Sequence, residues 1–252
     1  SDLENKLSDQ EGISIQDTNI KGLYHADDIV LLAANDKGLQ DMLHIANNFA
    51  ESWGMQFNHK KSQVLIVGKR CTDKKWILGN SHIAEVNSYK YLGVTINRQM
   101  KDNDHVSKTV ASKVKRLKDH ISYILAKHMD IKRLSFGNTL YHKVVLPSLS
   151  HAAGIWFTPS KQCRSQLASF QYQIGKSILK IKSTPSTAAT IGDLGWLPIS
   201  EHLNIQRISY YNHILNLPDN RLAKLVYTEM LQNFNDDTPG FNYTKFTKDI
   251  LV

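Results

Sequence analysis

The sequence predicts an α+β protein in which short antiparallel strands and one packed helix are followed by an all-helical region. Three observations predict this class. Residues 1–100 contain short apolar segments separated by turn residues, as strands do. One segment near residue 40 repeats its apolar residues at three and four positions, as an amphipathic helix does. From about residue 101 to about residue 234 the helical spacing dominates.

The composition predicts a folded, basic protein. With 252 residues, 41% of them hydrophobic and 21% charged, the chain is long enough for one large or two modest domains, and its composition is not that of a disordered chain. A net charge of +8 permits a polyanionic partner, of which nucleic acid is the commonest, but a basic protein without such a partner is equally compatible. Two distant cysteines, Cys71 and Cys163, exclude a disulfide scaffold and fit a reducing compartment. No apolar run approaches the ~20 residues of a membrane span.

The first segments predict a hairpin with acids at its tip. Leu3–Leu7 is typical of a helix end, and Ile13–Ile15 predicts a short strand and a turn. Two further strands, Leu23–His25 and Ile29–Ala33, flank Ala26-Asp27-Asp28. Both carboxylates are therefore expected at a tight turn.

An amphipathic helix follows. Asn35 or Asp36 can cap its start, and Gly54 occupies the position just after its expected end. Its apolar stripe consists of Leu39, Met42, Leu43, Ala46, Phe49, Ala50 and Trp53.

More strands are predicted after this helix. Met55–Asn58 and Gln63–Val67 surround the basic turn His59-Lys60-Lys61. Trp76–Leu78 and His82–Ala84 bracket Gly79-Asn80 as a hairpin, and Tyr89–Ile96 forms one further strand.

The remaining chain is predicted to be helical. The expected helices cover residues 106–124, 131–145 (ending at Leu146-Pro147), 163–181, 188–194, 199–215 and 221–234, with a turn at Gly195–Pro198. This organisation divides the chain into an α+β domain at 1–100, a helical region at 101–182 and a C-terminal helical region at 183–252.

Asp27 and Asp28 are the sharpest chemical feature. A bare Asp-Asp pair is most often a solvated turn. Here the pair lies between apolar strand residues, where two neighbouring negative charges are costly unless a cation offsets them. Carboxylate oxygens suit hard divalent cations, and two such ions can assist phosphoryl transfer.

Three motifs in order resemble those of reverse transcriptases of the non-LTR, LINE-type retrotransposon kind. Gly22–Leu32 resembles the catalytic palm motif, with His25 at the position where the family usually has an aromatic residue beside the primer terminus. Trp53–Ser62 resembles the next motif, an Asn-x-x-Lys-Ser turn, which implies that Lys61 protonates the leaving pyrophosphate. Each motif also has a plainer interpretation. The first could be a solvated turn, and the second could be a basic hairpin on the surface.

The third motif, Tyr91-Leu92-Gly93-Val94, resembles the primer grip and implies that Tyr91, Leu92 and Gly93 contact nucleic acid; alone it would equally suit a core strand with a bulge. The helical region after it then corresponds to a thumb that holds the duplex. Its basic row could contact phosphates or be only a solvated helix face. That row consists of Lys108, Lys113, Lys115, Arg116 and Lys118. Gly192–Pro198 resembles a segment beyond the thumb, for which we expect a structural role.

The resemblance implies part of a right-hand polymerase palm with thumb, and hence an RNA-directed DNA polymerase acting by two-metal nucleotidyl transfer in retrotransposon replication. It implies Mg²⁺ or Mn²⁺ held by Asp27 and Asp28, an RNA template, a DNA primer, dNTP in the intact enzyme, and a location in nucleus or cytoplasm.

Because Ser1–Leu7 resembles the stretch after the family's second palm motif, a further aspartate and the fingers are expected upstream of this chain. We therefore expect a fragment, from a truncated gene model or a decayed element, that is inactive alone. The alternative is a non-catalytic nucleic-acid-binding module derived from a retroelement.

Overall fold

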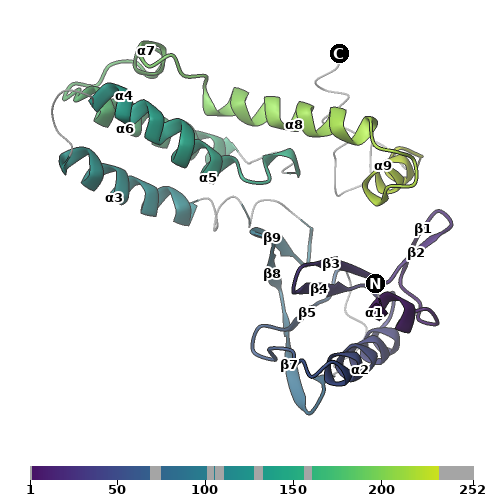
Figure 1. The fold of residues 1–252 in the computed structure, drawn as a ribbon. Coiled ribbons are helices and arrows are strands. Elements are labelled where there is room, and N and C mark those ends of the chain that lie inside the picture. Colours follow the sequence, from purple (N-terminus) through teal and green to yellow (C-terminus); the bar gives the residue numbers. More distant parts are fainter. Residues whose placement is uncertain are drawn as a thin grey trace. The chain divides into compact units, whose positions relative to one another are not determined.

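The structure, a computed structural model, describes residues 2–68, 75–100, 105, 111–127, 133–155 and 161–232, apart from the side chains at 111, 118, 122 and 125–127. It is mixed α/β, with small sheets and several helices (Figure 1). The chain divides into two compact units. Unit 1 comprises the described residues of 1–89, 97–99 and 218–235, and unit 2 those of 90–96 and 100–217. The predicted three-domain division stays a prediction.

Unit 1 contains short strands, two helices from the start of the chain and one helix from its end. In chain order they are α1 (Asp2–Lys6), β1 (Ile13–Ile15), β2 (Thr18–Ile20), β3 (Gly22–His25), β4 (Asp28–Leu31), α2 (Asp36–Ser52), β5 (Gln63–Leu65), β6 (Trp76–Leu78), β7 (Ser81–Val86) and α9 (Leu222–Gln232). A further hairpin, β8 (Ser88–Tyr91) with β9 (Val94–Asn97), lies where the chain passes between the units. Helix α9 contacts β1.

The strands form small sheets. β1 pairs with β2, β3 with β4, and β8 with β9. The largest sheet has the order β5-β7-β6, in which β6 is antiparallel to β7 but β5 is parallel to it. The predicted antiparallel strands are thus confirmed for most pairs, and the β5–β7 pair is a departure from them.

Helix α2 organises unit 1. Its start is capped because the Asn35 Oδ1 accepts the Gly38 backbone N–H at 2.8 Å, as predicted. Leu43 packs into one apolar cluster, with residues of β5, β6 and β7. Met42 and Ala46 pack into a second, with α1 and the β3–β4 hairpin. The Gln40 side chain also fastens β6, because its Nε2 donates to the Ile77 carbonyl at 2.7 Å and its Oε1 accepts the Ile77 N–H at 3.1 Å.

The predicted strand at Met55–Asn58 is wrong, because the end of α2 uses this backbone instead. Gly54 has φ +66°, and its N–H bonds to the Glu51 carbonyl at 3.0 Å. The Met55 N–H bonds to the Ala50 carbonyl at 2.9 Å. This pair of bonds is a Schellman motif, which satisfies the last carbonyls of the helix.

The predicted single strand at Tyr89–Ile96 is also wrong. The segment is the β8–β9 hairpin, broken at Leu92 and Gly93, which have φ values of 46° and 83°. Two successive residues with positive φ make a tight turn whose twist suits a two-residue hairpin.

Unit 2 is helical and is built around one central helix. Its elements are α3 (Ala111–Lys127), α4 (Arg133–Leu140), the π-helical η2 (Tyr141–Val145), α5 (Leu146–Ser150), the 3-10 turn η3 (Ala153–Ile155), α6 (Lys161–Leu179), α7 (Thr187–Asp193) and α8 (Ile199–Leu215). The buried face of α6 packs against α3, α4, α7 and α8. No described helix is both long and apolar enough to cross a membrane.

Most predicted helices are confirmed within a few residues; 106–110 lies outside the described residues. The predicted end at Leu146-Pro147 is wrong, because the helix continues to Ser150. The Leu146 N–H bonds to the Tyr141 carbonyl, five residues back, in the π-helical segment. Pro147 then falls in the first turn of α5, the helical position that tolerates proline best.

A polar side chain in the core joins the Gly192–Pro198 segment to the rest of unit 2. Gln171 is only 1% exposed. Its Nε2 donates to the Tyr141 hydroxyl and to the Leu197 carbonyl, both at 2.8 Å, and its Oε1 accepts the Ile199 N–H at 3.0 Å. Trp196 stacks on Tyr141, with ring centroids 3.6 Å apart. These contacts support the structural role predicted for the segment.

We predict that Gln171→Leu destabilises unit 2 by roughly 2–4 kcal/mol, because the buried Ile199 N–H, the Tyr141 hydroxyl and the partly buried Leu197 carbonyl lose their partner. Gln173→Leu is the matched control, since Gln173 is exposed on the same helix. Its free energy of unfolding should change by less than about 0.5 kcal/mol. Denaturant unfolding measures both, and equal effects would contradict the role of Gln171.

Candidate active site and nucleic-acid interface

The β3–β4 hairpin presents Asp27 and Asp28 as predicted. Its register pairs Tyr24 with Ile29 and His25 with Asp28, which leaves Ala26 and Asp27 as the turn. Tyr24 and Ile29 pack on the cluster beneath α2. Because side chains alternate along strands, His25 and Asp28 face the other side of the hairpin.

The turn holds a conformation that alanine rarely adopts. Ala26 has φ 51°. A left-handed residue with a Cβ costs roughly 1–2 kcal/mol, and such strain persists where surrounding packing imposes it. The packing of Tyr24 and Ile29 supplies that constraint here.

Both carboxylates are open to a ligand. Asp27, Asp28 and His25 are exposed, and no described group donates a hydrogen bond to either carboxylate. Carboxylate oxygens are the ligands that Mg²⁺ prefers, so the pair fits part of a magnesium site. Among the described residues, however, no group of three or more His, Cys, Asp or Glu side chains is placed to hold a metal ion.

The predicted basic turn is built by Asn58. Its carbonyl accepts the backbone N–H groups of Lys61 and Ser62 at 3.0 and 2.9 Å, and the Ser62 hydroxyl at 3.1 Å. The Asn58 Oδ1 also accepts the Lys61 N–H at 3.3 Å. The Tyr89 hydroxyl donates to the Lys61 carbonyl at 3.3 Å and so joins the turn to β8.

The Lys61 side chain is exposed, and no described ion pair or hydrogen bond joins it to Asp27 or Asp28. Unit 1 therefore contains His25, both aspartates and Lys61, but the structure does not bring the lysine into contact with the acids.

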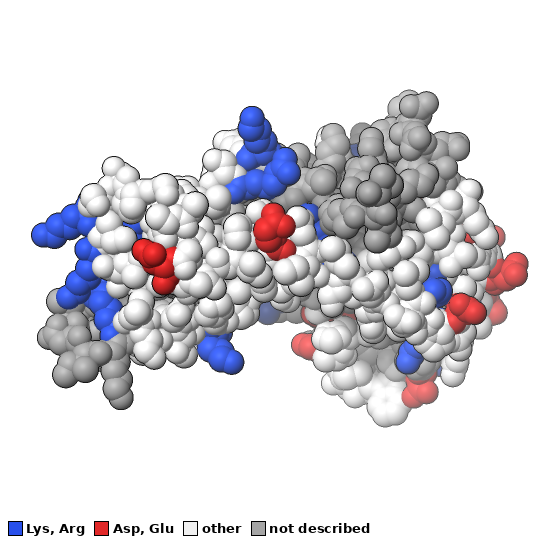
Figure 2. Space-filling model, turned by 90° about the horizontal axis from the view of Figure 1, so that it is seen from above, with Lys and Arg blue, Asp and Glu red and all other residues white. Residues whose placement is uncertain are grey.

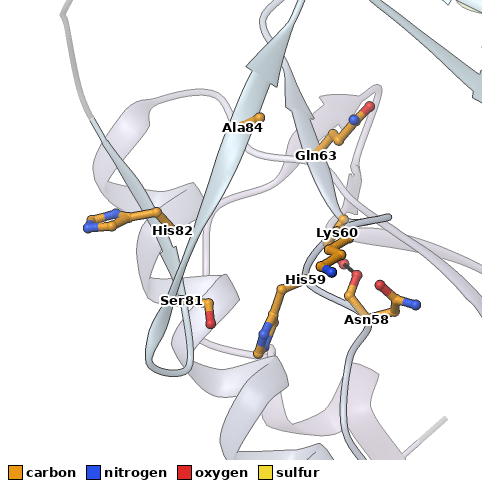
Figure 3. Close-up of a pocket in the computed structure, with 8 residues that line it drawn as sticks. Asn58, His59, Lys60, Gln63, Ser81, His82 and Ala84 are labelled. Carbon is orange, nitrogen blue, oxygen red and sulfur yellow. Dashed lines mark hydrogen bonds between the residues drawn. The ribbon is translucent and has the colours of Figure 1, made fainter.

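An open hollow of about 560 Å³ lies beside this turn (Figure 3). It is lined by Asn58, His59, Lys60, Ser62, Gln63, Ser81, His82 and Ala84, with no acid among them. Figure 3 shows Ser81 near His59, whereas His82 points away from the other labelled side chains. Sequence reasoning missed Ser81 and His82, because only the β5–β7 pairing brings them beside the turn.

The third motif occupies the tip of the β8–β9 hairpin, and its residues 90–96 belong to unit 2. Leu92 is exposed, while Tyr91 and Gly93 are half-buried. Behind the tip, the Thr95 N–H donates to Nδ1 of the buried His105 at 3.0 Å. The His151 ring bonds to the Leu92 carbonyl at 3.1 Å.

The basic row divides in the structure. Lys115 and Arg116 are exposed on α3, whereas Lys113 is half-buried and its Nζ donates to the Ser148 carbonyl at 3.2 Å. Burial lowers the pKa of Lys113, and Lys90 and Arg116 lower it further. Lys108 and the Lys118 side chain lie outside the described residues. Lys113 is thus directed toward the Ser148 carbonyl, and the contact of this row with nucleic acid stays a prediction.

Basic side chains gather in places on the face that Figure 2 shows. Several lie together at its left end and others at its upper edge, while acidic side chains lie singly among uncharged ones. Because the picture labels no residues, a nucleic-acid interface has to be argued from particular side chains.

The first 96 residues resemble a known family. Residues 2–96 match the family model described as reverse transcriptase (RNA-dependent DNA polymerase). Two proteins of Drosophila melanogaster are also similar. The probable RNA-directed DNA polymerase from transposon X-element is 23% identical over 193 residues, which cover 74% of this chain and 20% of that protein. The RNA-directed DNA polymerase from mobile element jockey is 24% identical over 230 residues, which cover 85% of this chain and 24% of that protein.

Residues 2–96 are thus similar to reverse transcriptases, and a larger part of the chain is similar to the RNA-directed DNA polymerases of two mobile elements. Both relatives are named as RNA-directed DNA polymerases of mobile elements, which agrees with the polymerase resemblance of the motifs. The chain spans only about a fifth to a quarter of the length of these relatives.

We predict that His105 makes stability depend on pH. Burial lowers the pKa of His105 from 6.5 to about 4, and the nearby Lys113, His151 and Lys90 side chains act in the same direction. The unfolded chain therefore binds a proton that the folded chain does not between these pH values. Stability from this group is present above pH 6.5 and is lost as the pH falls to about 4, by about 3 kcal/mol.

His105→Asn keeps an acceptor near the position of Nδ1 but does not titrate. The variant should therefore lose less stability than the wild type between pH 6.5 and 4. Denaturant unfolding at several pH values measures both proteins. If the free energies of unfolding of the two proteins change in parallel with pH, His105 does not contribute to the pH dependence.

Proposed function

We propose that unit 1 is the later part of a right-hand polymerase palm, and that Asp27 and Asp28 contribute to nucleotidyl transfer by an RNA-directed DNA polymerase. The observation that carries the proposal is the hairpin that exposes two adjacent carboxylates at its tip, within residues that match the family. Mg²⁺ or Mn²⁺, when bound, would stabilise the charge that develops on the transferring phosphoryl group. Asp27 and Asp28 would supply oxygen ligands on this side of the ion.

Lys61 and the hairpin tip complete the proposed assignment. The Asn58-capped turn fixes the backbone of Lys61 and leaves its ammonium group exposed, as a proton donor to a leaving pyrophosphate requires. His25 lies across the hairpin from Asp28, where it could touch the primer terminus. Tyr91, Leu92 and Gly93 would contact the primer strand of an RNA–DNA duplex.

A non-catalytic nucleic-acid-binding module is the second candidate. It is favoured by the lack of a third ligand near the two aspartates among the described residues. The two candidates differ in one measurement. A part of an enzyme gains polymerase activity when the fingers and first palm segment of a related polymerase are supplied, and a binding module does not.

We predict that the purified chain alone does not extend a DNA primer on an RNA template with either Mg²⁺ or Mn²⁺. Two carboxylates supply too few ligands for a two-metal site. Primer extension with labelled dNTP checks this. Extension that disappears on Asp27→Ala would contradict it.

We predict that Asp27→Asn in the intact parent enzyme lowers kcat at least about 100-fold, because a neutral amide does not replace the charge that holds the metal. Asp28→Asn should have a smaller effect, since it lies beyond the turn as the first residue of β4. Steady-state extension assays at saturating dNTP compare the two. A reversed order would overturn the assignment of Asp27.

We predict that Lys115→Gln together with Arg116→Gln weakens binding of an RNA–DNA duplex and makes its salt dependence shallower. Each lost phosphate contact removes roughly one unit from the slope of log affinity against log salt. Lys161→Gln with Arg164→Gln is the matched control, because both side chains are exposed in unit 2 at the start of α6. If the control lowers the slope equally, the α3 pair is only part of a solvated helix face.

A further inference from the structure

The turn at Leu92 and Gly93 has a conformation that its own residues do not explain. Both residues have positive φ, 46° and 83°. Glycine adopts this region readily, but a leucine meets a clash between its Cβ and the backbone. A non-glycine residue stays in such a conformation when surrounding contacts impose it. The exposed side chain of Leu92 makes little contact that could do so, since 43% of its surface is open to solvent.

His151 supplies the missing constraint from a distant part of the chain. Its Nε2 lies 3.1 Å from the Leu92 carbonyl oxygen, across 59 residues of sequence. Because a carbonyl only accepts, the bond requires a proton on Nε2. The ring also lies against the next residue, since a Cβ added to Gly93 would be 2.7 Å from the same Nε2 and 3.2 Å from Cδ2. One imidazole thus contacts both residues of the turn.

The backbone before and after His151 is fixed by the core of unit 2. Leu149 is 1% exposed, and Ser150 is buried, with its hydroxyl donating to the Leu146 carbonyl at 2.8 Å. Gln206 of α8 donates to that hydroxyl at 3.2 Å. Ala153, just after His151, is 1% exposed. The imidazole is therefore attached to a rigid part of the molecule, as a side chain that sets the conformation of another segment must be.

We propose that His151 is a positioning residue that holds the Leu92–Gly93 turn in the conformation that contacts a nucleic-acid strand. The contact with nucleic acid rests on the proposed function, whereas the control of the turn does not. His151 acts through the Leu92 carbonyl and is not itself a phosphate contact, because its Nε2 proton is already used in that bond. Removal of the His151 side chain should therefore loosen the turn and weaken the binding of nucleic acid. It should not change the number of counterions that the nucleic acid releases on binding.

The test uses the full chain with His151→Ala and with His151→Gln, whose amide nitrogen can donate near the position of Nε2. His213→Ala is the control, since His213 is exposed on α8 of the same unit. Two quantities are measured for each folded protein. The first is backbone hydrogen exchange at residues 92–94, without nucleic acid. The second is affinity for an RNA–DNA duplex over a range of salt concentrations.

For His151→Ala we expect exchange at the turn to be roughly 3- to 10-fold faster, the effect of one lost hydrogen bond. We expect duplex affinity to fall by a similar factor with an unchanged salt slope. His151→Gln should restore both, and the control should change neither. If His151→Ala does not fold, His151→Asn takes its place, because its shorter amide does not reach the Leu92 oxygen.

Unchanged exchange at the turn, or no restoration by Gln, would overturn the proposal. A slope lower by about one unit would overturn it too, because His151 would then be a phosphate contact itself. If the wild-type chain binds no duplex, the proposed function fails instead, and the exchange data still decide whether His151 holds the turn.

Discussion

The burial of α2 is the constraint on which unit 1 depends. Two-stranded hairpins are at best marginally stable by themselves in water, and the β1–β2 and β3–β4 sheets of this unit have only two strands each. Helix α2 offers one apolar side to the β5-β7-β6 sheet and another to α1 and the β3–β4 hairpin. The tip with Asp27 and Asp28 is therefore held from behind, through Tyr24 and Ile29, while its carboxylates stay exposed. Packing and chemistry use opposite faces of the same four-residue strands.

In unit 2, a polar side chain in the core holds one segment of the chain in place. After the exposed Gly195 turn, the chain passes the buried residues Trp196 and Ile199, where an unpaired amide or carbonyl is costly. Gln171 satisfies Leu197 and Ile199 at once, and Tyr141 serves both as its hydrogen-bond acceptor and as the ring on which Trp196 stacks. Burial accordingly raises the pKa of Tyr141 to about 12, partly offset by the bond from Gln171. A single buried amide thus fixes the path between α7 and α8.

Local signals in the sequence predicted what local contacts determine. Asn35 and Gly54 delimit α2, and the apolar flanks of Asp27 and Asp28 identified their hairpin. The β8–β9 hairpin was predicted as one strand, because leucine is not a typical turn residue although Leu92 lies in a left-handed turn. Pro147 suggested a helix end that the π-helical segment before it avoids.

In the candidate site, too, local contacts could be predicted from the sequence and contacts between distant segments could not. The Asn58 turn could be read locally, but the approach of Ser81 to His59 and of His151 to Leu92 depends on tertiary contacts between distant segments. No periodicity encodes such contacts. The inward position of Lys113 has the same origin, since only the packing of α3 beside Ser148 decides which basic side chains of the helix meet solvent.

The return of α9 to unit 1 has a consequence for how the molecule is made. β1 ends at Ile15 and α9 begins at Leu222, so their contact joins parts of the chain that are synthesised more than 200 residues apart. Closing so long a loop is entropically costly and raises the contact order of the unit. On the ribosome, unit 2 can assemble from its own continuous helices while the first unit still waits for its last helix to be translated. The part that contains the two aspartates would then finish folding after unit 2, although most of its residues are synthesised before those of unit 2.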